Sequence, residues 1–306
     1  MSPCKSFGHL SVVAIGEVLW DVYEHKRHLG GAPFNFIYTC YSLGARASLI
    51  SRVGNDEAGA EIVRLMSEHG MVTDLIQIDD ERPTGTVQVR LDRAGVPTFT
   101  IAENVAWDHI ELPAEAIEAV RQADIVCFGT LAQRTPMSAR TITKALNRTK
   151  PGALRLLDLN LRQNFYTESL VRDSLSEAGI LKLDESEMKT LCAMFGLEGS
   201  SESCALWLLD QFALDIVVLT MGARGASAWR GREFAHVDGL RVAVHDTVGC
   251  GDAFAAAFAL NLASGASLAD ALRAANIVGG YLALCDGATP ALSPEILTEF
   301  EAAVGA

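Results

Sequence analysis

The run Asp246-Thr247-Val248-Gly249-Cys250-Gly251-Asp252 places two glycines just before an alanine-rich segment, residues 253–263, which Gly265 follows. A short β-like run, residues 241–245, precedes it. This order predicts a strand, a glycine-rich turn and a helix that begins next to Asp252. The free backbone N–H groups and the dipole of such a helix favour an anion at its first turn. Glycines there allow a ligand to approach the backbone closely.

Asp252 has two interpretations. A carboxylate at the mouth of an anion site could accept the proton of a hydroxyl group that attacks phosphorus, and the helix N-terminus should keep it ionised. Alternatively, Asp252 only caps the helix, since acidic N-caps are common. A dinucleotide-binding pattern is disfavoured, because Phe254 stands where the third glycine of G-x-G-x-x-G would be. The local sequence leaves catalysis and capping both open.

The rest of the chain alternates between apolar runs and helix-length segments. The runs lack strict polar alternation, as expected of strands that are covered on both faces. Helices are predicted at residues 33–43 and 57–69, and a capping box at Ser267 opens a long helix that runs toward Asp286. The pattern predicts a three-layer α/β/α core with a mostly parallel sheet. Its strands are expected at residues 12–15, 47–53, 125–128, 154–159, 180–183 and 216–220.

One region departs from this alternation. Residues 84–91 and 96–101 are rich in β-formers, and Asp92-Arg93-Ala94-Gly95 between them has the composition of a hairpin turn. Residues 22–29 are also extended in character but polar. We expect a small β-sheet lid, formed by segments about 22–32 and 84–102, within a single domain of residues 1–306.

Composition limits the classes of function. The chain has 306 residues, 49% hydrophobic and 21% charged, as in ordinary globular enzymes. A net charge of −13 argues against a nucleic-acid or anionic-membrane partner. The seven cysteines are scattered without a C-x-x-C pair, which predicts neither a disulfide framework nor a thiolate metal site. No apolar leader or membrane-length stretch is seen, so we expect a cytoplasmic protein with reduced thiols.

Two motifs together carry a family resemblance. Residues 246–252 resemble a D-T-x-G-A-G-D signature, with Cys250 in place of the usual Ala, and Gly30-Gly31-Ala32-Pro33-Phe34-Asn35 resembles a G-G-x-x-x-N signature. With both, the chain resembles the PfkB (ribokinase-like) carbohydrate kinases nearly end to end, and within them the bacterial fructokinases. Fructokinase-like stretches lie at residues 16–21, 53–56, 103–108, 128–134 and 158–162.

The resemblance implies ATP-dependent phosphoryl transfer to a sugar hydroxyl group, with Mg²⁺. Asp252 would be the catalytic base, and Arg162 could brace the transferred group. The amides of Gly249, Cys250 and Gly251 would form the anion hole, whereas Asp21, Gly30, Gly31, Asn35, Glu103, Asn104 and Asn160 would bind the sugar. The nucleotide would contact Asp184, Glu187, Thr220, Gly222, Gly225 and Asn276.

Ions and partners follow from the same resemblance. Asp184 replaces the Asn of an N-x-x-E pattern, and we expect Asp184 and Glu187 to organise Mg²⁺ through water, with helix capping as the alternative for Asp184. Many relatives bind K⁺, for which Asp246, Val248 and carbonyls near Gly287 would be the ligands. Family members often form a homodimer through the lid.

Cys250 is this chain's own variation. A thiol at a helix N-terminus tends toward a lowered pKa. We therefore expect thiol reagents to inactivate the protein and bound nucleotide to protect it.

The expected activity is that of a fructokinase, converting D-fructose and ATP to fructose 6-phosphate and ADP. A 2-keto-3-deoxygluconate kinase, or another PfkB sugar or nucleoside kinase, is the alternative. A catalytically silent sugar-binding regulator is disfavoured because Asp252 and both glycines are intact. The expected partners are ATP and a small sugar, with no nucleic acid and no membrane.

Overall fold

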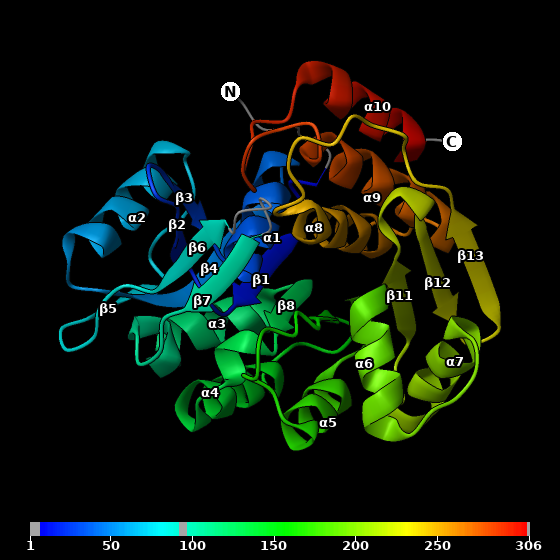
Figure 1. Cartoon of the computed structure of the whole chain (residues 1–306), viewed down its shortest axis with the longest axis horizontal. Coiled ribbons are helices and arrows are strands. Elements are labelled where there is room, and N and C mark those ends of the chain that lie inside the picture. The colour runs from blue at the N-terminus through cyan, green and yellow to red at the C-terminus, as the bar shows by residue number, and fades with distance from the viewer. Residues whose placement is uncertain (1–6, 92–96, 305–306) are drawn as a thin grey trace.

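A nine-stranded sheet in the order β13-β12-β11-β10-β9-β8-β1-β4-β5 forms the centre of the computed structural model, which describes residues 7–91 and 97–304 (Figure 1). The predicted apolar runs are its core, and all of them pair in parallel. They are β1 (Ser11–Ile15), β4 (Arg46–Gly54), β8 (Ile125–Gly129), β9 (Leu154–Asp158), β10 (Ile180–Asp184) and β11 (Ile216–Thr220). A parallel strand, β5 (Ile76–Asp79), ends one edge, and the antiparallel strands β12 (Ala226–Arg230) and β13 (Glu233–Val237) end the other.

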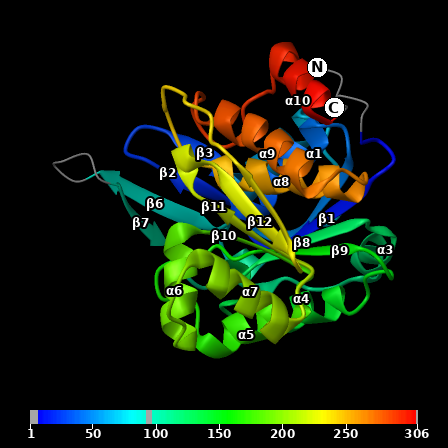
Figure 2. The same cartoon turned by 90° about the vertical axis from the view of Figure 1, so that its right-hand side faces the viewer.

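Helices cover both faces of this sheet (Figure 2). In β1, Val12 and Ala14 pack into one hydrophobic cluster, whereas Val13 and Ile15 pack into the other. This confirms the predicted three-layer α/β/α core. The first layer contains α1 (Ala32–Ser42), α2 (Glu57–Glu68), α8 (Cys250–Ala263), α9 (Leu268–Leu282) and α10 (Pro294–Val304), and the second contains α3 (Ala114–Gln122), α4 (Pro136–Leu146), α5 (Glu168–Glu177), α6 (Glu185–Phe195) and α7 (Ser201–Phe212).

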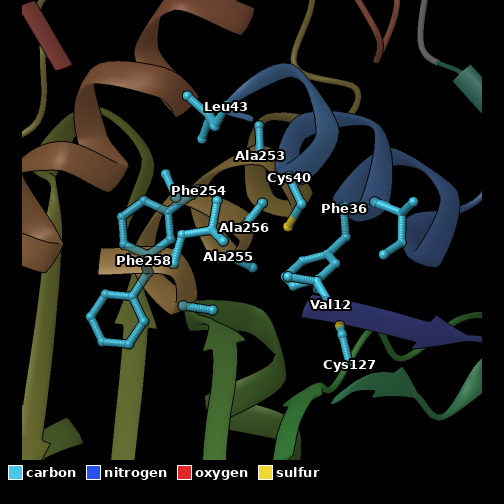
Figure 3. Close-up of a cluster of buried hydrophobic side chains, with 14 of the residues drawn as sticks. Val12, Phe36, Cys40, Leu43, Cys127, Ala253, Phe254, Ala255, Ala256 and Phe258 are labelled. Atoms are coloured by element: carbon cyan, nitrogen blue, oxygen red, sulfur yellow. The ribbon is translucent and has the colours of Figure 1, made fainter. Parts of the chain in front are cut away.

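The alanine-rich helix α8 lies in the middle of the first layer. Figure 3 shows Ala253 and Ala256 of α8 beside Phe36 and Cys40 of α1, with Val12 of β1 nearby. Alanine has almost no side chain to hold two helices apart, so α8 can lie close to α1. Both helices begin at the same edge of the sheet, where Asn35 in the first turn of α1 donates to Asp252 in the first turn of α8.

The small second sheet has the strand order β3-β2-β6-β7. Its strands are β2 (Leu19–Val22), β3 (Arg27–Gly30), β6 (Thr86–Leu91) and β7 (Pro97–Ile101). The sheet begins at Leu19, earlier than the predicted residue 22, because Leu19 and Trp20 are buried and pair with Gly30 and Leu29. The hairpin turn predicted at residues 92–95 lies outside the described residues.

Two predicted elements differ from the structure. Residues 241–245 form no strand: they run irregularly from β13 to α8, and His245 N–H bonds only the Ala283 carbonyl at the end of α9 (2.7 Å). The long helix α9 ends at Leu282, short of Asp286, and Gly287 then takes a positive φ of 75°. Both differences lie next to the anion-site turn, where the backbone forms a pocket wall rather than regular structure.

The structure also shows the state of the cysteines and the hydropathy of the helices. Within residues 7–91 and 97–304 the cysteines are free thiols, and those of Cys192 and Cys204 touch between α6 and α7. Among the helices of these residues, none is long and apolar enough to cross a bilayer.

Candidate active site

A cleft of about 780 Å³ opens between the small sheet and the carboxyl ends of the parallel strands. Ligands of open α/β sheets bind at this edge. Most residues predicted for the sugar, the phosphoryl group and the metal ions line this cleft, as does Thr220, which was predicted to contact the nucleotide. The others are Asp21, Gly31, Asn35, Asn160, Arg162, Asp184, Glu187, Val248, Gly249, Gly251 and Asp252.

Asp252 joins the two sequence motifs. The Asn35 side chain, on α1, donates from Nδ2 to Asp252 Oδ2 at 2.7 Å. Gly249 is the N-cap of α8, and no side chain caps this helix, so the capping interpretation of Asp252 is wrong. The helix begins at Cys250, earlier than predicted, which places Asp252 inside its first turn.

Both glycines of the turn lie close to neighbouring groups, and at Gly249 the backbone also requires glycine. Gly249 has φ 77°, and a Cβ on it would lie 2.6 Å from Ala288 Cβ. A Cβ on Gly251 would lie 2.9 Å from Lys182 Nζ. The Cys250 N–H already donates to the Thr247 carbonyl at 3.3 Å, so it is less free to bind an anion than was expected.

Asp21 lies on β2, against the G-G pair. Gly31 has a φ of 110°, and a Cβ on it would meet the Glu17 carbonyl at 2.5 Å, so this position needs glycine. A Cβ on Gly30 would meet Asp21 Oδ2 at 2.4 Å and would displace that carboxylate. Gly30 leaves room for the Asp21 carboxylate and does not itself line the cleft. Burial raises the pKa of Asp21 to about 6, and Arg162 opposes this rise.

A buried ion pair at the cleft floor was not predicted. Lys182 Nζ, on β10, donates to both oxygens of Asp158, on β9, at 3.0 and 3.1 Å. Burial alone would lower the pKa of Lys182, but the carboxylates of Asp158, Glu187 and Asp252 raise it above its ordinary value. The sequence could have shown that a lysine inside an apolar strand needs an acidic partner, but not which residue that partner is.

Glu17 is a second residue that the sequence did not single out. It follows β1, lines the cleft and is only 2% exposed. Burial raises its pKa to about 7, and the nearby Asp252 adds to the rise. Burial likewise raises the pKa of Asp252, against the opposing effects of Lys182, Asn35 and Arg162. The helix N-terminus was expected to keep Asp252 ionised, but burial instead raises the pKa of this carboxyl group above its ordinary value.

Asp184 and Glu187 form a reciprocal capping box at the start of α6. Asp184 Oδ1 accepts from Ser186 N (2.8 Å) and Glu187 N (2.9 Å), so the capping alternative for Asp184 is confirmed. Glu187 accepts from Asp184 N and, at 2.9 Å, from Leu161 N. In the part of the chain that the structure describes, no group of three acidic, His or Cys side chains could hold a metal directly. The oxygen donors here suit a hydrated Mg²⁺ held through water.

A second pocket of about 460 Å³ adjoins the cleft. Thr220, Thr247 and Gly251 line both cavities. The remaining residues predicted to bind a nucleotide line this pocket, namely Gly222, Gly225 and Asn276, together with the apolar side chains of Leu240, Val242, Val244 and Phe254. An apolar slot beside an anion site fits a flat ring that carries phosphates.

The model of the pfkB family carbohydrate kinases matches residues 4–295. This chain belongs to that family. The match spans both signature motifs, the Lys182–Asp158 pair and both cavities, so the family assignment covers the whole candidate site.

Individual relatives agree with this assignment. An uncharacterized sugar kinase of Pyrococcus horikoshii is 30% identical over 250 residues, which cover 80% of this chain and 76% of the relative. Its crystal structure aligns with a TM-score of 0.82 over 95% of this chain and 98% of its own. A fructokinase of Vibrio alginolyticus is 27% identical, over 74% of this chain and 73% of its own. The fold of Vibrio cholerae fructokinase aligns with a TM-score of 0.80 at 23% identity, over 95% and 99% of the two chains.

Glu103 and Asn104 are not brought to the cleft of this carbohydrate kinase. Both are exposed and follow β7. Their stretch instead anchors the lid: Arg134 donates to both oxygens of Asp108 (2.6 and 2.8 Å) and to the Ala102 carbonyl (2.6 Å). This fructokinase-like segment therefore joins a lid strand to the core.

Asp246 connects two loops of the carbohydrate kinase. Its carboxylate accepts from Val248 N (3.1 Å) and Gly287 N (3.2 Å), so the three residues named for K⁺ do lie together.

The lowered pKa expected for the Cys250 thiol is wrong. Burial and the carboxylates of Asp246 and Asp252 raise the pKa of its thiol to about 11, so these effects outweigh the helix dipole. The half-buried Cys250 lines the second pocket as a neutral thiol.

Proposed function

We propose that this carbohydrate kinase transfers a phosphoryl group from ATP to D-fructose, giving fructose 6-phosphate and ADP. The observation that carries the proposal is the 2.7 Å bond between Asn35 and Asp252, which joins the sugar motif to the phosphoryl motif. The names of relatives support it: the Pyrococcus horikoshii sugar kinase was crystallised with ATP, at 27% identity, and Vibrio cholerae fructokinase with fructose, ADP and a calcium ion.

The two cavities divide the substrates. The sugar occupies the cleft beneath the small sheet, where Asp21 and Asn35 offer fixed hydrogen-bonding groups for hydroxyls. ATP occupies the adjoining pocket, with its base against the apolar wall and Asn276. Its phosphates then pass Thr220 and Gly251, which line both cavities, and reach Asp252.

The reaction is a single displacement. The sugar oxygen forms a bond to the γ-phosphorus, the bond from phosphorus to the bridging oxygen breaks, Asp252 takes the hydroxyl proton and ADP leaves. The amides of Gly249 and Gly251, with Arg162, stabilise the charge on the transferred group. Mg²⁺ neutralises charge on the ATP phosphates when bound, and Asp184 and Glu187 would hold it through water. A K⁺ ion beside Asp246, Val248 and Gly287 would support the same turn.

The charges of the cleft favour a neutral sugar. Among the described residues that line it, six are acidic and two are basic: Glu17, Asp21, Asp158, Asp184, Glu187 and Asp252 against Arg162 and Lys182. Lys182 is already paired with Asp158. The carboxylate of 2-keto-3-deoxygluconate would meet this negative field, and the described lining residues offer it no free buried cation, whereas fructose carries no charge.

A coupled assay of ADP release across a substrate panel tests the proposal. Fructose should give the highest kcat/KM among fructose, other neutral sugars, 2-keto-3-deoxygluconate and nucleosides, and EDTA should abolish turnover until Mg²⁺ is restored. Preference for 2-keto-3-deoxygluconate or a nucleoside would select that alternative. If no acceptor in the panel gives ADP, the proposal is contradicted and a catalytically silent regulator is favoured.

A further inference from the structure

The Lys182–Asp158 ion pair lies directly below the first turn of α8. Lys182 and Asp158 are paired in register on the parallel strands β10 and β9, and each is less than 10% exposed. The ammonium group is close enough to α8 that a Cβ on Gly251 would lie 2.9 Å from Nζ. Two strands and two hydrogen bonds therefore fix this charge beside the anion-site turn.

The position of this cation is costly for the helix. The N-terminus of α8 already carries the positive end of the helix dipole, so an ammonium group there destabilises α8. A buried ion pair is also not needed for stability, because well-packed apolar side chains of similar volume often serve as well or better. Fold stability thus gives no reason for a lysine at this place.

The surroundings of Asp252 do give a reason. Negative groups face it from several elements: Glu17 after β1, Asp21 on β2 and Glu187 on α6, with Asp158 on β9 beyond Lys182. The cations that oppose them are Lys182 and Arg162. Arg162 is exposed, so water and salt screen its charge, whereas Lys182 is buried and screened much less.

We propose that Lys182 is a positioning residue whose fixed ammonium group keeps Asp252 in the carboxylate form that can accept the hydroxyl proton of the sugar. The inference rests on the proposed kinase reaction. Asp158 accepts two hydrogen bonds from the ammonium group, but its own negative charge opposes the effect of Lys182 on Asp252. Lys182 acts through Asp252 and needs no contact with either substrate.

Two variants that break the same ion pair separate this role from a structural one. Lys182→Met removes a positive charge, and Asp158→Asn removes a negative one. The acid limb of the pH profile of kcat/KM for the sugar should therefore move to higher pH, by about one unit or more, in Lys182→Met. In Asp158→Asn it should move to lower pH. The acid limb reflects all the coupled carboxylates together, so its pH is not the pKa of one residue. Shifts in opposite directions in the two variants would nevertheless follow from the opposite charges that they remove.

Matched controls complete the experiment. Lys182→Arg keeps the charge and should keep the limb near its original pH. Asp108→Asn breaks the buried pair with Arg134 away from the cleft, and should lower thermal stability without moving the limb. If Lys182→Met does not fold, as judged by circular dichroism, Lys182→Gln takes its place, because it keeps a donor to Asp158.

The outcomes are distinct. Shifts of the same sign in Lys182→Met and Asp158→Asn, or no shift in folded variants, would overturn the role of Lys182 while the kinase reaction stands. Absence of turnover with every acceptor in the unmodified protein would overturn the proposed function itself.

Discussion

Asp252 is the residue on which the proposed chemistry depends, and its neighbours define what its replacement should do. Asp252→Asn keeps the size of the side chain but removes the carboxylate. We expect kcat to fall by about 10²–10⁴-fold, since this is the usual contribution of a positioned general base. The affinities for ADP and the sugar should stay within a few-fold, as measured by calorimetry. A variant that keeps most of its turnover would remove Asp252 from the reaction.

Sequence alone predicted Asp252 and Asn35 from the two signature motifs, and Asp21 from the fructokinase-like stretch of residues 16–21. It did not identify Lys182 or Glu17, although both line the cleft. Lys182 gains its importance from a partner on the neighbouring strand and from the nearness of Gly251, and neither is visible before strand order and register are known. Glu17 lies in the fructokinase-like stretch of residues 16–21, but only the burial of its side chain distinguishes it from an ordinary loop residue.

At the scale of elements, the two ends of α8 provide a matched test of the turn. Gly249 and Gly265 have similar positive φ values of 77° and 88°, but a Cβ on Gly249 would meet Ala288 whereas one on Gly265 would meet nothing within 4 Å. Gly265→Ala should therefore cost only about 1–2 kcal/mol of backbone strain and keep activity. Gly249→Ala carries the same strain and also displaces the anion-site turn, so kcat should fall by at least tenfold more.

Chemical denaturation and the coupled assay, run on both glycine variants, check this prediction. Equal loss of turnover in the two would show that backbone strain alone matters and that the contact with Ala288 does not.

The lid is attached to the core by Arg134. Its guanidinium group pairs with Asp108 and lies over the rings of Trp107 and Phe165, with Cζ at 4.0 and 4.6 Å from the ring centroids. The Arg134 side chain is only 5% exposed. Arg134→Ala leaves the Asp108 carboxylate buried without its partner, and should lower the free energy of unfolding by about 3–5 kcal/mol.

The exposed pair of Arg64 and Glu68 on α2 is the control for Arg134. Arg64→Ala should change the free energy of unfolding by about 0.5 kcal/mol or less, when both variants are measured by urea titration. Losses of similar size in the two variants would mean that Arg134 does not anchor the lid.

Element boundaries were the least predictable feature. Residues 241–245 have strand-like composition, but β13 is already paired with β12 and no further strand lies at that edge in the described residues. The lid begins at Leu19 because burial of Trp20, and not local propensity, fixes where β2 starts. In both cases tertiary pairing decided the outcome.

At the scale of the whole molecule, the buried acids of the cleft oppose stability. Glu17 loses its proton near pH 4.5 in the unfolded chain but near pH 7 in the folded one. The folded state therefore binds the extra proton between these values, and stability falls as pH rises through this window. Above about pH 7 the cost reaches about 3 kcal/mol.

Glu17→Gln removes this cost. Relative to the unmodified protein, the variant should gain about 3 kcal/mol of unfolding free energy between pH 4 and pH 8, as measured by denaturant titration at both values. The other acids are common to both proteins and cancel in the comparison. A difference that does not change with pH would show that Glu17 ionises normally.

The overall architecture was predictable because both of its signals are local. Apolar runs without alternation indicate covered parallel strands, and glycines, prolines and capping boxes mark the helices between them, so the three-layer core is confirmed. The order of the strands and the meeting of α1 with α8 required the structure, since they depend on contacts between residues such as Asn35 and Asp252 that are far apart in the chain.

The two cavities share Thr220, Thr247 and Gly251 as a common wall. Because these residues line both cavities, the cavities adjoin, and a single compound could reach from one into the other. A purine joined through a short chain of anionic groups to a polyhydroxylated ring would gain effective concentration from each half. Such a bisubstrate ligand should bind this protein far more tightly than either half alone.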